Sequence, residues 1–101
     1  MIKHIVFFEL AEHAEGRTKA ENALKIKHDL ENLIHLIPEL KTIEVGINHA
    51  DAPATNYDAA LYVEVESLAA LDIYQKHPEH QKVTAFISKI KTARAAVDYE
   101  V

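Results

Sequence analysis

Histidine is unusually frequent in this sequence: the 101 residues contain seven histidines and four tyrosines but no cysteine. An imidazole exchanges its proton near neutral pH, so a buried histidine can serve as an acid or a base. A neighbouring phenol can donate a hydrogen bond to a carbonyl or enolate oxygen. The absence of cysteine excludes disulfides and thiolate zinc sites. The composition therefore favours acid–base chemistry by histidine and tyrosine.

The segment His77-Pro78-Glu79-His80 holds two of the histidines three residues apart. Two such side chains at the start of a helix can share a metal ion. However, Pro78 turns His77 away from the helical face that carries His80, and no third ligand follows nearby. We therefore expect no metal here. The other histidines outside the strands are expected at the surface: His13, His28, His35 and His49.

Hydrophobic periodicity predicts the elements that position these side chains. Strands are predicted at 2–10, 40–48, 57–66 and 95–100, and a helix at 17–37 that Pro38 ends. A further helix begins at Leu68, after Ser67 as N-cap, and is broken by Pro78 into a second piece that reaches about Lys91. The order β-α-β-β-α-β predicts a ferredoxin-like α+β fold, in which both helices cover one face of a four-stranded antiparallel sheet. We expect residues 1–101 to form one such domain.

Alternation along the strands assigns residues to the face that the helices cover. The more apolar set of each strand is expected on this face: Ile2, Val6 and Phe8; Ile43, Val45 and Ile47; Leu61, Val63 and Val65; and Val97. By the same alternation His4, Tyr57 and Tyr99 should point toward the helices.

Helical spacing brings two further polar side chains to the same interior. Tyr74 lies three residues after Leu71, and His80 lies three residues before Val83 on the stripe that includes Phe86 and Ile87. We therefore predict a pocket of the apolar kind that binds small molecules. His4, Tyr74 and His80 are its expected catalytic residues, and the expected substrate-binding residues are Phe8, Tyr57, Phe86 and Tyr99. The alternative, in which these side chains are packed and hydrogen-bonded core residues, stays open.

The opposite face of the sheet carries Ile5, Phe7 and Tyr62 among Thr42, Glu44, Glu64 and Asp98. This mixture is too apolar for open water and too polar for a monomer core. A second copy packed sheet to sheet would cover it, so the sequence predicts a homodimer.

Charge and hydropathy exclude other classes of partner. The formal net charge of -5 argues against nucleic acid, which attracts clustered lysine and arginine. No segment approaches the roughly 20 apolar residues of a membrane span, and the apolar run at residues 1–9 is too short for a signal peptide. We expect a cytoplasmic protein.

Several stretches together resemble one family over almost the whole chain. They are residues 1–8, 43–48, 57–67, 98–100 and above all 71–80, where Tyr-x-x-His-Pro-x-His occurs. They are similar to the stress-responsive α/β-barrel (Dabb) family, and the resemblance implies a ferredoxin-like protomer that dimerises into an α/β barrel.

The family includes plant stress proteins and a polyketide cyclase of the olivetolic acid cyclase kind. The resemblance implies that His4, Tyr74 and His80 correspond to site residues of that cyclase, with Tyr74 and His80 as its acid–base pair. The cyclase has a histidine on the third strand where this chain has Ala59. This departure argues against polyketide cyclisation here but leaves the pocket itself intact.

Three functions follow from the residues. The first is an enzyme in which Tyr74 and His80 transform a small carbonyl-bearing metabolite by lyase- or cyclase-like acid–base chemistry, oriented by His4 and without a cofactor. The second is a non-catalytic module that binds an apolar metabolite in the same pocket. The third is a purely structural dimer with a filled core.

Overall fold

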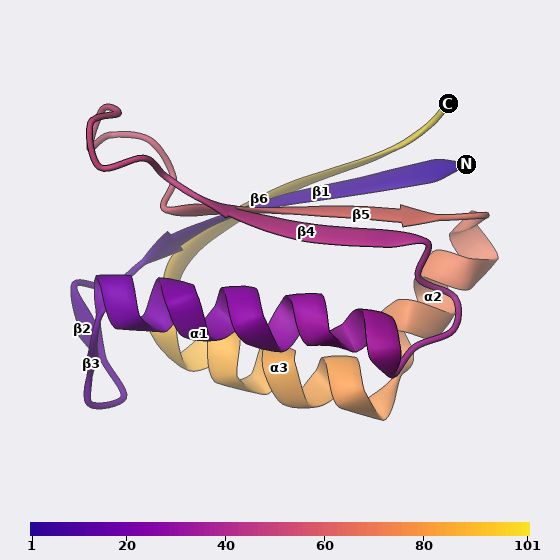
Figure 1. Ribbon diagram of the computed structural model, residues 1–101, viewed down its shortest axis with the longest axis horizontal. Coiled ribbons are helices and arrows are strands. Elements are labelled where there is room, and N and C mark those ends of the chain that lie inside the picture. The colour runs from indigo at the N-terminus through magenta and orange to yellow at the C-terminus, as the bar shows by residue number, and fades with distance from the viewer.

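The computed structural model describes residues 1–101 as a sheet backed by helices (Figure 1). In chain order the elements are β1 (Ile2–Leu10), β2 (His13–Ala14), β3 (Arg17–Thr18), α1 (Lys19–Glu31), the 3₁₀ turn η1 (Asn32–His35), β4 (Thr42–Ile47), β5 (Ala59–Val65), α2 (Leu68–Lys76), α3 (Pro78–Ile90) and β6 (Lys91–Glu100).

The main sheet has the strand order β4-β5-β1-β6, and each neighbouring pair is antiparallel. Helices α1 and α3 lie side by side on one face, and the other face is left uncovered (Figure 1). The ferredoxin-like fold predicted from the sequence is therefore confirmed. None of its helices is both long and apolar enough to cross a membrane.

The helix starts follow from local capping. The Ser67 hydroxyl accepts a hydrogen bond from the backbone N–H of Ala70, as an N-cap does. Pro78 occupies the first turn of α3, where its missing N–H costs nothing. Thr18 and Glu21 form a reciprocal capping box, so α1 begins at Lys19 and not at residue 17 as predicted.

The sequence analysis missed a short hairpin before α1. Strands β2 and β3 are joined by Glu15 and Gly16, whose φ angles are +51° and +75°. Two consecutive residues with positive φ form the kind of two-residue turn that matches the twist of paired strands. The predicted helix at 17–37 was therefore too long at both ends. Its first two residues belong to β3, and residues 32–35 form the 3₁₀ turn.

Most of the predicted inward residues lie in the core between sheet and helices. Val6, Leu61 and Val63 are among the 19 buried apolar residues of one cluster. His4 and Asn22 are the buried polar residues. The β1–β5 register places Val6 opposite Leu61 and His4 opposite Val63, as alternation predicted.

The prediction for the last strand was wrong. Tyr99 pairs with Lys3 and Val97 with Ile5, so both point to the uncovered face, while Asp98 pairs with His4 on the covered face. The uncovered face is itself apolar, and the more apolar set of β6 belongs there.

Tyr57 was also assigned to the wrong side. It precedes β5, and its ring lies 6.0 Å from that of Phe7, a residue of the uncovered face, measured between centroids. Because Tyr57 lies outside the ladder, strand alternation does not extend to it.

Candidate active site

Three aromatic rings from three elements meet between the sheet and the helices. His4 comes from β1, Tyr74 from α2 and His80 from α3. The Tyr74 ring lies 4.4 Å from the His80 ring and 6.4 Å from the His4 ring, between centroids. The structure thus brings together the three residues that the sequence predicted as catalytic.

His80 has one ring nitrogen held by the backbone. Its Nδ1 lies 3.0 Å from the carbonyl oxygen of Gln75, which can only accept, so Nδ1 carries the hydrogen. Burial lowers the pKa of His80, and the positive charges of nearby groups, including Arg94, act in the same direction. The bond to Gln75 opposes this shift only in part. In the favoured neutral ring, Nε2 holds a lone pair and can accept a proton.

Tyr74 is fully buried, with 0% of its surface exposed, and its hydroxyl has no hydrogen-bond partner. A buried hydroxyl without a partner is uncommon, because it has lost its bonds to water without replacement. Burial raises the pKa of this phenol above its usual range, so the group stays protonated and remains a hydrogen-bond donor.

His4 is buried and forms a hydrogen bond through Nδ1 with the carboxylate of Asp98. The β1–β6 register sets these two residues opposite each other. An ionised carboxylate only accepts, so Nδ1 of His4 donates to it and the ring orientation is fixed. Sequence reasoning missed Asp98, because Val97 and Tyr99 misled the assignment of faces in β6.

A cavity of about 270 Å³ opens beside these rings. Its walls come from the helices α1, α2 and α3 and from the sheet, and they include His4 and His80 but not the fully buried Tyr74. The other lining residues are Val6, Phe8, Leu30, Leu61, Gln75, Thr84, Ile87, Ser88, Lys91 and Arg94.

The predicted substrate-binding residues divide in this structure. Phe8 lines the cavity. Phe86 does not, because its position on α3 turns it toward α1, where Lys25 lies 4.8 Å from its ring centroid. Tyr57 and Tyr99 lie on the far side of the sheet.

His77 has a local structural role. Its Nδ1 accepts a hydrogen bond of 3.1 Å from the backbone N–H of Glu79 and so caps α3. No three histidine, aspartate or glutamate side chains come close enough together to hold a metal ion.

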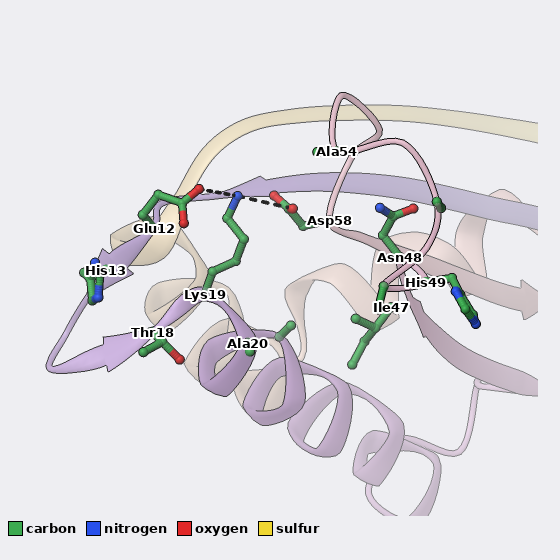
Figure 2. Close-up of a pocket in the computed structure, with 13 residues that line it drawn as sticks. Glu12, His13, Thr18, Lys19, Ala20, Ile47, Asn48, His49, Ala54 and Asp58 are labelled. Atoms are coloured by element: carbon green, nitrogen blue, oxygen red, sulfur yellow. Dashed lines mark ion pairs between the residues drawn. The ribbon is translucent and has the colours of Figure 1, made fainter.

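A second pocket, of about 590 Å³, lies at the other end of the sheet, between the start of α1 and residues 48–58 (Figure 2). Here Nζ of Lys19 pairs with Glu12 at 3.1 Å and with Asp58 at 3.4 Å. Asp58 also accepts a hydrogen bond of 2.7 Å from the backbone N–H of Leu10. We refer to Glu12, Lys19 and Asp58 as the Asp58 cluster; each of its three charged groups has an opposite charge within ion-pair distance.

Comparison with solved structures identifies relatives along the full length of the chain. A dimeric protein of unknown function with a ferredoxin-like fold from Bacteroides fragilis NCTC 9343 is 32% identical; the match covers 99% of this chain and 95% of that one, with a TM-score of 0.78. A dimeric ferredoxin-like protein of unknown function from Thermobifida fusca is 29% identical over 99% and 90% of the two chains, with a TM-score of 0.82.

The fold is shared more widely. Hydroxynitrile lyase from Passiflora edulis is 17% identical over 99% of this chain and 92% of that one, with a TM-score of 0.78, a likeness that concerns the fold alone.

No significant match occurs among curated proteins. The model of the Stress responsive A/B Barrel Domain family (Dabb) matches residues 2–101. The chain therefore belongs to the stress-responsive α/β-barrel family, as its sequence motifs indicated.

Proposed function

We propose that this protein is a homodimer that uses Tyr74 and His80 for acid–base chemistry on a small carbonyl compound. The observation that carries the proposal is the buried Tyr74 hydroxyl, which has no partner although it lies beside two histidines. A ligand oxygen would supply the missing acceptor. Removing a proton next to a carbonyl requires a base at the carbon and a donor at the oxygen, and the two side chains match these roles.

In the proposed step, Nε2 of neutral His80 takes a proton from the carbon next to the carbonyl group. The electrons of the broken C–H bond form the C=C bond of an enolate, and the negative charge develops on the oxygen. Tyr74 donates its hydrogen bond to that oxygen. Return of a proton from His80 to the carbon regenerates the carbonyl compound, so no oxidant or other co-reactant is consumed.

His4 and Asp98 have a supporting role in this proposal. The hydrogen bond between them fixes the His4 ring, which packs edge-on against Tyr74. The pair therefore limits the positions that the Tyr74 ring can adopt. Asp98 is a positioning residue, since it acts through His4.

One observation favours the second candidate function, binding without turnover. Tyr74 is fully buried and absent from the cavity walls, so a ligand oxygen must penetrate beyond these walls to reach its hydroxyl. A module that only binds would need the cavity but no contact between ligand and Tyr74.

Deuterium exchange distinguishes the two functions. Phenylpyruvate and its neutral methyl ester both carry exchangeable protons next to a ketone. In D₂O the protein should accelerate loss of these protons in the NMR spectrum, and Tyr74→Phe and His80→Gln should each lower the accelerated rate by a factor of about 100 or more. His35→Gln, at an exposed histidine, is the matched control. An exchange rate equal to that in buffer alone would leave only the binding function.

The homodimer in this proposal is formed by the uncovered face of the sheet. Phe7, Tyr99 and Val97 are 39%, 42% and 50% exposed there, beside Ile5 and Tyr62. Correcting the orientation of β6 adds two apolar side chains to the face predicted from the sequence. The relatives from B. fragilis and T. fusca are dimeric.

Phe7→Asp should convert the dimer to a monomer, because a buried carboxylate without a partner opposes association. Sedimentation velocity at micromolar concentration measures this. Leu24→Asp places the same change on the exposed side of α1 and should leave the dimer intact. A wild-type monomer would contradict this part of the proposal.

A further inference from the structure

The basic side chains of this protein are almost all paired. Of the eleven lysines and arginines, eight form ion pairs with carboxylates: Lys3, Lys19, Lys25, Lys27, Lys41, Lys76, Lys82 and Lys89. A ninth, Arg17, lies over the ring of Phe86 at 5.7 Å from its centroid. The two that remain are Lys91 and Arg94, whose side chains have no hydrogen bond, ion pair or aromatic partner.

Both unpaired cations line the cavity of the candidate active site. They come from β6, the edge strand of the sheet, which pairs only with β1. Arg94 lies opposite Phe8 in the register and Lys91 opposite Leu10, so both belong to the covered face. Arg94 is near enough to His80 for its charge to lower the pKa of that imidazole.

Lys91 and Arg94 have no acidic partner, although the chain contains more acidic than basic residues. The chain has 16 acidic residues and a formal net charge of -5, so carboxylates are available in excess. None of the cavity walls is acidic. The one carboxylate on the covered face of β6 nearby, Asp98, is already bonded to His4. Two cations without counter-ions at a cavity wall create a positive potential that attracts an anion.

We propose that the ligand of this cavity is a carboxylate, with its anionic group held by Lys91 and Arg94 and its body on the apolar wall. This inference rests on the function proposed above and specifies the class of substrate: a small keto acid or related carboxylate, not a neutral ketone. Arginine can bind a carboxylate through two parallel N–H groups, and lysine adds a point charge.

The remaining walls fit the rest of such a molecule. Val6, Phe8, Leu30, Leu61 and Ile87 provide an apolar surface, and the hydroxyls of Thr84 and Ser88 lie on the α3 side. A volume of about 270 Å³ lies just below the usual range of small-molecule pockets, so a ligand with one ring and a short acidic chain fits better than a nucleotide or a coenzyme.

The test compares two inert probes of the same size and shape, the charged 3-phenylpropanoate and the neutral 3-phenylpropanamide, by NMR titration of the labelled protein. We expect the carboxylate to bind at least about fivefold more tightly, since an exposed charge pair contributes about 1 kcal/mol. Lys91→Met and Arg94→Met should each weaken carboxylate binding about fivefold and leave amide binding unchanged.

Lys89→Met is the matched control, because it removes the same charge two residues before Lys91 from a lysine that faces Glu15 outside the cavity. It should leave both affinities as in the wild type. Equal affinity for the two probes, no binding of either up to their solubility limit, or equal weakening of both probes in the Arg94 variant would overturn the inference.

These outcomes are independent of the proposed chemistry, because neither probe has a ketone. Exchange on methyl phenylpyruvate without a preference for the carboxylate probe would leave the acid–base function standing and remove the anion site. Preference for the carboxylate probe without any deuterium exchange would leave the anion site standing and remove the acid–base function.

Discussion

Two polar clusters lie near opposite ends of strand β1, and they differ in how far their hydrogen-bonding groups are satisfied. At the end of the strand, Asp58 bonds to the backbone of Leu10 and pairs with Lys19, which also pairs with Glu12 (Figure 2). Near its start, the rings of His4, Tyr74 and His80 meet, yet the Tyr74 hydroxyl has no partner. We infer that the first cluster stabilises the fold and that the second is left incomplete for a ligand.

The larger hollow belongs to the first cluster, at about 590 Å³ against about 270 Å³. Of these two cavities, size alone would favour the one whose charged groups are already paired. The buried and unpaired Tyr74 hydroxyl points instead to the smaller cavity, since a fold retains such a group at a cost in stability.

The largest expected effect on stability is that of Asp58→Ala. The substitution leaves the Leu10 N–H without its acceptor and Lys19 without one of its two carboxylates. The free energy of unfolding should fall by about 1–3 kcal/mol in urea denaturation. Asp51→Ala, at an exposed position of the same loop, should change it little. The rate of deuterium exchange should be unaffected, and a wild-type midpoint for Asp58→Ala would remove the distinction between the clusters.

A smaller effect should appear in the pH dependence of stability. Burial lowers the pKa of His80 in the folded protein, so the unfolded chain binds this proton more readily. Stability from this group is therefore present above the unfolded value near 6.5 and is lost as the pH falls through it toward the folded value. Urea midpoints should decline less steeply below pH 7 in His80→Gln than in wild type. In His35→Gln the decline should follow wild type, and identical slopes in all three proteins would contradict the burial of His80.

The smallest effect on stability is expected for Tyr74→Phe. Because the hydroxyl has no partner, its removal should leave the free energy of unfolding within about 0.5 kcal/mol of wild type or raise it. Tyr62→Phe provides the comparison, since the Tyr62 hydroxyl accepts a hydrogen bond of 2.6 Å from Lys3. A large loss of stability in Tyr74→Phe would mean that the hydroxyl is satisfied in solution and that the second cluster is structural as well.

The sequence predicted the parts of the fold where one physical signal dominates. Alternation in β1 placed His4 inward, Ser67 and Pro78 marked the helix starts, and helical spacing placed Tyr74 and His80 near each other. The assignment of inward and outward residues failed in the strand whose outward face is also part of an apolar surface. In β6 the apolar residues Val97 and Tyr99 face away from the helices. The rule that the more apolar set points inward therefore assigned the two faces of β6 the wrong way round, and Asp98 was not recognised as a residue of the covered face.

Two other features depended on signals that periodicity does not contain. In the sequence only Gly16 indicates the β2–β3 hairpin, because each strand has two residues, too few for alternation to be recognised. The unpaired state of Lys91 and Arg94 is a property of the whole set of ion pairs, which no spacing along the chain reveals.

The passage from α3 to β6 has a consequence for how a ligand enters. The helix ends at Ile90 and the strand begins at Lys91, with no loop between them. His80 and Arg94 therefore belong to one continuous segment, and widening the cavity must displace either the helix or the edge strand that follows it. We expect the edge strand to yield, because it pairs only with β1, so that opening for a ligand frays β6 from β1. The amide hydrogens of β6 should exchange with solvent as one cooperative unit, and an occupied cavity should slow the exchange of all of them together.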